Sequence, residues 1–437
     1  MAKRVAAQSV VALLLAGVLA GSPCLSAGAA GVDNQQLLKQ IQELRSRLNQ
    51  LEKQVEANRK AAGTPSSARK ATTVNGQRKK PKAPKAPKPQ HVKIGGALWL
   101  NYARTSFSAA SRSKKGDLGF DLLRLDVNGS LHNVLISAQY RWYRYMNVVH
   151  HAWIGYDFAN HWQGQLGITQ VPFGILPYAS HSYWFGVPYY MGLEDDYNAG
   201  VKFVHHQGPW NVDLAFFKNA AWGQASDLDR YSFDVVQVGA QQNQEINQLN
   251  ARVAYRLGSA HGPHAELGLS TEYGRLYNAT TDGLGNHWAV AAHMNSYFGP
   301  WNLQLEAVDY RYNPDNPQGV SDRTVLVGAF GTSHPVAARG RLYVANLARD
   351  FRVHWGPISK LTCYNDYSVL KKAESGFADS KLNTLGCLIT AKPVYVYVDA
   401  IFGKNMTFLG DNGDGMAAGN PNASWHNRFN INLEYYF

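Results

Sequence analysis

The stretch NRFNINLEYYF, residues 427–437, decides the fold class. Every second residue in it is apolar: Phe429, Ile431, Leu433, Tyr435 and Phe437. The residues between them are polar or charged: Arg428, Asn430, Asn432 and Glu434. Because successive side chains of a β-strand point to opposite faces, this segment has one apolar and one polar face. Alternation of apolar and polar residues over about ten positions is typical of a strand in a membrane-spanning barrel. The alternative is an edge strand of a soluble β-sandwich.

Tight turns with Gly or Pro separate the other alternating segments. They are HQGPW (206–210), SAHGPH (259–264), FGPW (298–301), HWGP (354–357) and AKP (391–393). Long polar loops lie between these breaks, near residues 104–117, 172–197, 219–247, 277–286, 312–340, 369–382 and 405–426. If the first strand, near 92–102, starts on the periplasmic side, every tight turn lies on that side. The count is then 16 strands, eight outer loops and seven tight turns.

The sequence therefore predicts an all-β fold, a 16-stranded antiparallel transmembrane β-barrel, over residues 91–437. An even number of strands requires that residues 324–330 belong to a loop rather than to a strand. Sixteen strands leave a water-filled lumen rather than an interior packed with side chains. The polar rows expected to line that lumen include Arg124, Asp126 and Asn128 on one strand and Ser137, Gln139 and Arg141 on the next.

The N-terminal residues 1–29 have the pattern of a secretory signal peptide. Lys3 and Arg4 precede an apolar run over 5–20, and Ala27-Gly28-Ala29 forms an A-x-A cleavage site. A lipoprotein signal at Cys24 is a weaker alternative. No later stretch has the roughly 20 consecutive apolar residues of a membrane-spanning helix.

Residues 33–57 are expected to form a coiled-coil helix. Apolar residues repeat at alternating spacings of four and three: Leu37, Ile41, Leu44, Leu48, Leu51 and Val55. Within this heptad seam, RLNQLE resembles the R-h-x-x-h-E motif of short trimeric coiled coils, with Arg47, Leu48, Leu51 and Glu52 as the trimerisation residues. The alternative is a single amphipathic helix.

Residues 58–90 form a basic linker rich in Lys and Pro, which is expected to be disordered or extended. Residues 1–90 contain 16 Lys and Arg against four Asp and Glu, a balance of +12 that equals the formal charge of the chain. The remaining 27 basic and 27 acidic residues cancel, so the barrel region is neutral and a nucleic-acid partner is not expected. The linker could instead contact anionic peptidoglycan in the periplasm.

The third outer loop lies within GITQVPFGILPYASHSYWFGVPYYMGLEDDYNAGVKF, residues 167–203. A loop of about 25 residues with so many aromatic side chains is expected to pack against the barrel or to fold into it. Its aromatic residues could stack on sugar rings or pack the loop on the wall: Tyr183, Trp184, Phe185, Tyr189 and Tyr190. Its acidic residues, Glu194, Asp195 and Asp196, are candidates for selecting solutes by charge.

Four segments together resemble the phosphate-selective porin O and P family. They are LRLDVNGSL (123–131), GQLGITQVPFG (164–174), NLEYYF (432–437) and the coiled coil that precedes the barrel. The resemblance implies a homotrimeric channel in the outer membrane lipid of a Gram-negative bacterium, with its N-terminal region in the periplasm. It also implies passive uptake of small solutes or ions, with a preference for anions, and neither a cofactor nor an enzymatic activity.

The sequence departs from that family near the third loop, because no Lys or Arg occurs between Arg144 and Lys202. An acidic loop without basic residues would favour cations or neutral solutes. Basic residues elsewhere on the strands could still attract anions: Arg124, Arg141, Lys202, Lys218 and Arg252. A carbohydrate-selective porin and a structural or adhesive outer-membrane protein remain as alternative functions.

The sequence also raises two questions about pairs of residues. His150-His151 and His205-His206 are adjacent, and neighbouring side chains of a strand point to opposite faces, so no metal site is expected at either pair. Cys363 and Cys387 flank one outer loop and would face each other if Ser368 pairs with Leu382, which makes a cross-strand disulfide one of the alternatives.

Overall fold

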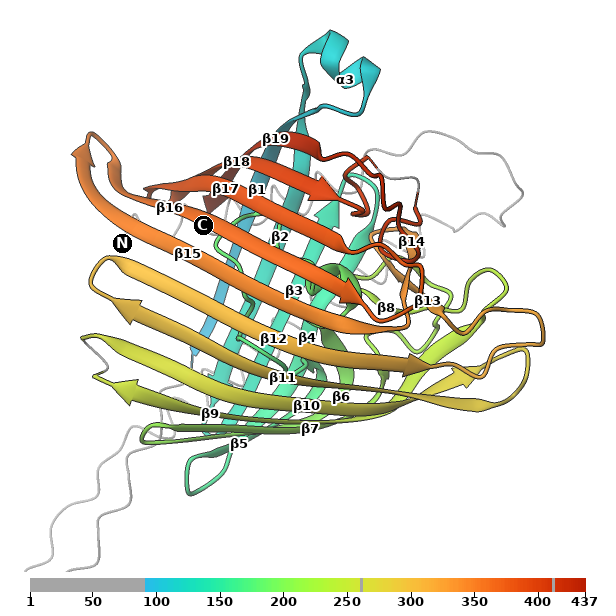
Figure 1. Cartoon of the computed structure of the whole chain (residues 1–437). Helices are drawn as coiled ribbons and strands as arrows, with labels where there is room; N and C mark the ends of the chain where they lie inside the picture. The colour runs from blue at the N-terminus through green and yellow to red at the C-terminus, as the bar shows by residue number, and fades with distance from the viewer. Residues whose placement is uncertain (1–90, 260–261, 411–412) are drawn as a thin grey trace, which may run out of the picture. The chain divides into compact units, whose positions relative to one another are not determined.

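The computed structural model describes residues 91–259, 262–410 and 413–437, which form one closed β-barrel (Figure 1). The predicted signal peptide, coiled coil (including Arg47, Leu48, Leu51 and Glu52) and linker lie outside the described residues. No helix within the described ranges is long and apolar enough to cross a membrane.

Sixteen antiparallel strands make the barrel, which confirms the predicted fold class and strand number. In chain order they are β1 (His91–Thr105), β2 (Asp117–Leu131), β3 (Val134–Tyr143), β4 (Asn147–Asp157), β5 (Trp162–Gln170), β6 (Tyr197–Gln207), β7 (Trp210–Ala220), β9 (Asn243–Gly258), β10 (His264–Asn278), β11 (Leu284–Phe298), β12 (Trp301–Asn313), β15 (Arg339–Trp355), β16 (Ile358–Lys372), β17 (Ser380–Ala391), β18 (Val394–Lys404) and β19 (His426–Tyr436). The strand that opened the sequence argument closes the barrel, because β19 pairs with β1 through residues such as Leu433 and Leu100.

The connections alternate between short turns at one end of the barrel, here called the turn end, and mostly longer loops at the other, the loop end. All five of the predicted Gly or Pro turns lie at the turn end, as at 208–209 and 356–357. The first loop carries a short helix, α3 (Ala109–Lys114), which the Ser108 side chain caps by accepting a hydrogen bond from the Ser111 N–H.

Residues 324–330 differ from the prediction that they form a loop. They contribute β13 (Thr324–Ala329), which pairs with β14 (Thr332–Ala337) and β8 (Asp234–Val235) in a separate three-stranded sheet. The segment is a strand because its apolar residues Val325 and Val327 are fully buried among the loops. It does not enter the barrel, so the even strand count holds.

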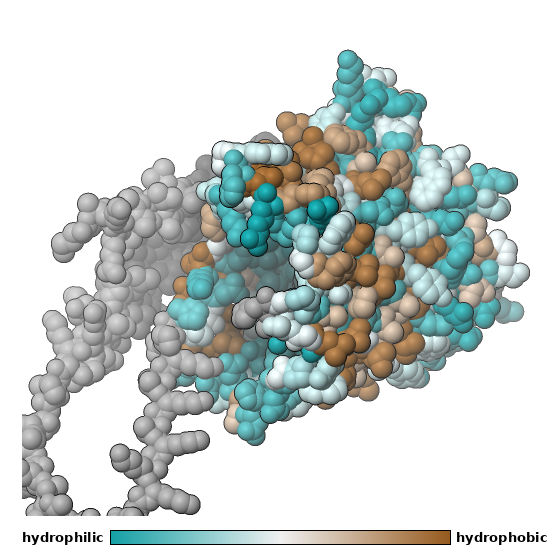
Figure 2. All heavy atoms as spheres, turned by 60° about the vertical axis from the view of Figure 1, so that its left-hand side comes forward, coloured by the Kyte–Doolittle hydropathy of each residue, from teal (hydrophilic) through white to brown (hydrophobic). Residues whose placement is uncertain are grey.

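The outer face of the barrel is apolar and exposed. Its large exposed residues include Ile154, Leu166, Leu249, Leu269 and Leu347. Figure 2 shows brown, hydrophobic patches on the side of the molecule that faces the viewer. The alternate residues face inwards and are mostly polar. A closed barrel with this arrangement has no open sheet edge, pairs its backbone groups between strands and presents apolar side chains to lipid, so it is built to span a membrane.

The lumen differs from the expected open interior at the loop end. There the loops and the inward-facing strand residues pack into an apolar cluster. Its buried members include Tyr189, Met191, Phe233, Val327, Leu342 and Met416. Burial of apolar loop residues stabilises this packing by roughly 25 cal/mol per Å² of surface removed from water. The number of strands alone does not predict it.

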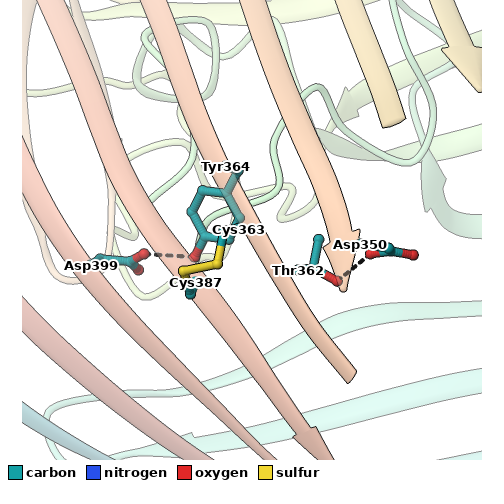
Figure 3. The surroundings of a disulfide bond; sticks show 6 residues. All are labelled: Asp350, Thr362, Cys363, Tyr364, Cys387 and Asp399. Atoms are coloured by element: carbon teal, nitrogen blue, oxygen red, sulfur yellow. Dashed lines mark hydrogen bonds between the residues drawn. A yellow bond between two sulfur atoms is a disulfide. The ribbon is translucent and has the colours of Figure 1, made fainter. Parts of the chain in front are cut away.

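Cys363 and Cys387 are joined by a disulfide with an S–S distance of 2.09 Å (Figure 3). They are direct partners on β16 and β17, and Ser368 is paired with Leu382, which is the register that the sequence argument required. The neighbouring Tyr364 points inwards, where its hydroxyl donates a hydrogen bond of 2.6 Å to Asp399. The disulfide therefore belongs to the outer face of the wall.

Candidate functional site

The third loop, residues 171–196 and here called the lumen loop, leaves the wall between β5 and β6 and enters the barrel. Its first part is held by β9, β10 and β12. The Gly174 N–H donates to Ser270 Oγ at 3.1 Å, and the Gly174 carbonyl accepts from Arg252 Nε at 2.8 Å. The Ile175 N–H donates to Glu306 Oε2 at 2.8 Å. These wall residues point inwards, so the loop lies inside the lumen at this point.

The middle of the lumen loop is anchored on β16. Asp366 Oδ2 accepts hydrogen bonds from the N–H groups of His181 and Ser182 at 2.6 and 2.9 Å. The His181 ring lies between Asp366 Oδ1 at 2.7 Å and Asn302 Oδ1 on β12 at 2.6 Å. Burial alone would lower the pKa of His181, but its hydrogen bond to Asp366 and the charge of that carboxylate raise it. An imidazolium therefore fits between two acceptors here.

The loop then reaches the wall formed by β1, β2, β18 and β19. The Tyr183 hydroxyl donates to Asp121 on β2, and its ring lies 5.9 Å from the ring of Trp99 on β1. The guanidinium of Arg428 on β19 lies 4.6 Å from the centroid of the Trp184 ring. The loop thus contacts walls on several sides of the barrel and narrows the lumen.

The three acidic residues at the end of the loop are buried, with exposed fractions of 5%, 7% and 6% for Glu194, Asp195 and Asp196. Glu194 Oε1 accepts from the Ala179 N–H at 3.0 Å. Asp195 accepts from the Tyr231 hydroxyl at 2.6 Å. Burial raises the pKa of Asp195 to about 6 and raises the pKa values of Glu194 and Asp196 well above the usual range of carboxyl groups. These side chains face the loop and its neighbours rather than open water.

The aromatic residues of the lumen loop fall into two groups. Tyr189 and Tyr190 are buried in the apolar cluster, and the Tyr189 hydroxyl donates to the Tyr231 carbonyl at 3.1 Å. Tyr183, Trp184 and Phe185 are partly exposed. Only the second group has ring surface that a solute could contact.

Two of the predicted basic residues face each other on neighbouring strands. Arg124 on β2 is the direct partner of Arg141 on β3. Arg124 forms an ion pair with Asp126 at 2.8 Å. Arg141 has neutral partners, donating to Gln139 Oε1 at 2.6 Å, and its guanidinium lies 4.5 Å from the Tyr231 ring centroid.

The other basic candidates lie in different surroundings. Lys202 is buried and donates to the Gln170 carbonyl at 2.9 Å. Arg252, 1% exposed, is bound to Gly174 and pairs with Glu266 at 2.5 Å, so it supports the loop. The prediction that Lys218 lines the lumen is wrong. Lys218 alternates with Phe217, which points inwards, and shares the outer face with Leu214 and Phe216.

The histidine pairs also differ from each other. A β-bulge in β4, where Gln139 pairs with His151 and Tyr140 with Val149, leaves His150 unpaired. Both rings are therefore on the lumen side, with 3.0 Å between their Nδ1 atoms. The argument that adjacent histidines diverge fails at this pair because the bulge breaks the alternation. The alternation is kept at the second pair, His205 and His206, where the His205 ring stacks on Trp162 on the outer face. Within the described ranges, no three His, Cys, Asp or Glu residues form a metal-binding group.

A cavity of about 530 Å³ opens at the turn end of the lumen. Its lining comes from β1 to β4 and β19 and includes Lys93, Arg124, Asp126, Asn128, Gln139 and Tyr436. Figure 2 turns this end towards the viewer and shows hydrophilic residues around it. The polar rows predicted on β2 and β3 thus line this entrance.

Three residues of the site do not appear in the sequence argument: Asp121, His181 and Asp366. Arg428 appears there as part of the polar face of the last strand, and alternation could have placed Asp366 on the inner face in the same way, because it is flanked by outward-facing residues. No local pattern indicates that Asp366 or Arg428 would meet the lumen loop, since the contact between His181 and Asp366 joins residues 185 positions apart.

The fold is shared with outer-membrane proteins of known structure. The outer membrane channel DcaP of Acinetobacter baumannii is similar with a TM-score of 0.50 and 14% identity, over 81% of this chain and 99% of that chain. The anion-selective porin from Comamonas acidovorans has a TM-score of 0.50 and 14% identity, over 80% and 100%. OmpT of Vibrio cholerae has a TM-score of 0.50 and 14% identity, over 79% and 97%. No protein-family model matches the sequence, and no curated sequence matches it. At these identities, the likeness establishes the 16-stranded barrel fold.

Proposed function

We propose that the protein is a porin in the outer membrane of a Gram-negative bacterium, through which small hydrophilic solutes or ions diffuse passively. The observation that carries the proposal is the lumen loop, which is tied to the inner wall of a 16-stranded barrel by polar contacts from β9 to β16. A barrel of 16 strands is too wide for its own side chains to fill. A loop held in this way therefore narrows the lumen and leaves room for a passage beside it.

The passage is proposed to run between the lumen loop and the wall of β1, β2, β3 and β19. Side chains on both sides are partly exposed there: Trp99, Arg124, Tyr143, Tyr183, Trp184, Arg428 and Tyr436. We place the solute pathway here because the backbone of the loop is bound to the wall of β9 to β16. Its contacts with β1, β2 and β19 are made by the side chains of Tyr183 and Trp184.

A weak preference for anions fits this pathway better than a preference for cations. The acidic residues of the loop are buried, and burial favours their neutral forms. Arg141 and Arg428 lie beside the passage with neutral hydrogen-bond partners. Phosphate-type anions, which the family resemblance suggests, belong to this class of solute. The homotrimer is likewise part of the proposal and rests on the coiled-coil motif around Arg47 and Glu52.

A carbohydrate-selective channel is the second candidate. Partly exposed rings follow one another along the wall: Tyr395 and Tyr436 have centroids 5.4 Å apart, Tyr436 and Trp99 6.5 Å, and Trp99 and Tyr183 5.9 Å. Aromatic faces of this kind bind the apolar faces of sugar rings. Blockade of the ion current by oligosaccharides, but not by small anions, would favour this candidate.

Single-channel recording of the purified protein in planar bilayers tests the proposal. We expect stepwise conductance and a reversal potential of the sign of anion preference in a salt gradient. Absence of any conductance step would reject the porin and favour a structural or adhesive role. A strong cation preference would retain the porin and reject the assignment of the pathway to the arginine side.

A further inference from the structure

Basic side chains gather on the outer face at the loop end of the barrel. Along β16, β17 and β18, the last outward-facing position near the loops is a lysine: Lys371, Lys381 and Lys404. On β15 the last two outward-facing positions are both arginines, Arg339 and Arg341. The next positions on the same faces are aromatic or apolar on three of the strands, Tyr343, Val369 and Phe402, and Asn383 on β17. The cations therefore lie at the edge of the lipid-facing belt.

The register brings these cations together in pairs. Arg341 is the direct partner of Lys371 across β15 and β16, and Lys381 is the direct partner of Lys404 across β17 and β18. Directly opposed residues have Cβ atoms about 5 Å apart, and like charges in such positions destabilise a sheet. An anion bound between them would remove that cost.

Carboxylates of the chain compensate only part of this charge. Arg341 pairs with Asp309 at 3.0 Å, and Lys371 pairs with Asp379 at 2.5 Å. Lys381 and Lys404 have no ion pair within the described part of the chain. Four cations thus face two carboxylates, which leaves a local excess of two positive charges.

Further cations lie at the same end on the outer face of other strands: Arg104, Lys218, Arg275 and Arg311. The turn end is different, because its outer face has aromatic residues such as Trp162, Trp210 and Trp301. Arg349 also lies on the outer face at the turn end, but aromatic rings cover its charge: its Cζ atom lies 5.0 Å from the ring centroid of Trp301 and 4.8 Å from that of Phe351. The two rims of the barrel therefore suit two different membrane surfaces.

We propose that Lys381, Lys404, Arg341 and Lys371 bind the phosphate groups of a phosphorylated glycolipid in the outer leaflet of the membrane. Phosphates on a lipid headgroup lie just outside the hydrocarbon region, at the level where these side chains end the apolar belt. Arg and Lys are suited to such groups because they donate charged hydrogen bonds to phosphate oxygens. The inference is independent of what passes through the lumen.

The test uses the full-length protein in detergent and purified lipopolysaccharide as the probe. Binding is measured by fluorescence anisotropy of labelled lipopolysaccharide, with the wild type and the double variant Lys381→Gln/Lys404→Gln. We expect the double variant to bind at least about tenfold more weakly, since each basic residue near an anionic surface contributes about a factor of five. Lys381→Arg/Lys404→Arg should bind like the wild type.

Three controls separate the alternatives. Arg349→Gln, at the other rim, should bind like the wild type. Dephosphorylated lipopolysaccharide should bind at least about tenfold more weakly to the wild type, and inorganic phosphate at 10 mM, roughly the concentration that a weak free-ion site would need, should not displace the probe. Equal binding by the Gln variant, or equal binding of the dephosphorylated lipid, would overturn the proposal. Full displacement by inorganic phosphate would identify a free-anion site instead. Heat-dependent migration on gels verifies that each variant is folded.

Discussion

Asp366 on β16 and His181 in the lumen loop face each other inside the barrel, with 2.7 Å between Asp366 Oδ1 and His181 Nδ1. The other oxygen of the same carboxylate accepts two backbone N–H groups of the loop, at His181 and Ser182. Hydrogen bonds to an ionised group are stronger than those between neutral groups. One wall residue therefore fixes the segment of the loop that turns towards the opposite wall.

Replacing Asp366 by Ala should loosen the lumen loop. The free energy of unfolding should fall by about 3–5 kcal/mol, because His181 and two N–H groups lose a buried charged partner. The loop should also fluctuate within the lumen, so the single-channel current of the variant should be larger and noisier than that of the wild type. Urea unfolding of the refolded barrel and planar-bilayer recording measure the two effects.

Asp350→Ala is the matched control for that experiment. Asp350 is an aspartate on β15 near the turn end, where it pairs with Lys360 at 3.1 Å and accepts from the Thr362 hydroxyl at 2.6 Å, and it has no hydrogen bond or ion pair with the lumen loop in the described structure. Both side chains are about 40% exposed, so the loss should be below about 1 kcal/mol. Equal current noise in the two variants would contradict the anchoring role of Asp366.

Asp195 should make the stability of the barrel depend on pH. Burial raises its pKa in the folded protein to about 6, above the usual value of 3.8, so folding favours the protonated carboxyl. This contribution is complete below about pH 4 and is lost as the pH rises through about 6, with a slope of at most about 1.4 kcal/mol per pH unit. Asp195→Asn should remove this part of the slope. Urea unfolding at pH 4, 5, 6 and 7 measures it, and parallel profiles for the two proteins would contradict the prediction.

The barrel wall could be predicted from the sequence because each strand carries its own signal. The alternation in residues 427–437 and the turns with Gly or Pro are local, and both report the two-sided environment of a membrane strand. The disulfide between Cys363 and Cys387 was one of two alternatives, because it depended on the pairing of Ser368 with Leu382, which the structure has.

The interior could not be predicted in the same way, because it depends on contacts between distant residues. The bulge that turns both His150 and His151 inwards has no local signal. Lys218 is an exception, because the alternation of Leu214, Phe216 and Lys218 along its own strand already points to the outer face. The meeting of Tyr183 with Asp121 requires the loop to cross the barrel, and loop length alone does not set that direction.

Removing the disulfide should destabilise the barrel. Cys363 and Cys387 are 24 positions apart. Closing a loop of this size lowers the entropy of the unfolded chain and so stabilises the folded barrel by about 3 kcal/mol. The double variant Cys363→Ser/Cys387→Ser should unfold at a lower urea concentration, with unchanged single-channel conductance since the disulfide lies on the outer face. Wild type kept in dithiothreitol should unfold like the variant. The same midpoint with and without reductant would contradict the prediction.

Arg141 should contribute to anion preference, because its hydrogen-bond partners in the described structure, Gln139 and Tyr143, are neutral. A unit charge about 8 Å from a passing ion in water changes the ion's free energy by about 0.5 kcal/mol, or about twofold in occupancy. Arg141→Gln should therefore lower the anion-to-cation permeability ratio about twofold, whereas Arg141→Lys should retain most of it. Lys218→Gln removes the same charge from the outer face and should leave the ratio unchanged. Reversal potentials in a tenfold KCl gradient measure the three variants. Equal ratios for Arg141→Gln and Lys218→Gln would show that Arg141 does not face the ion pathway.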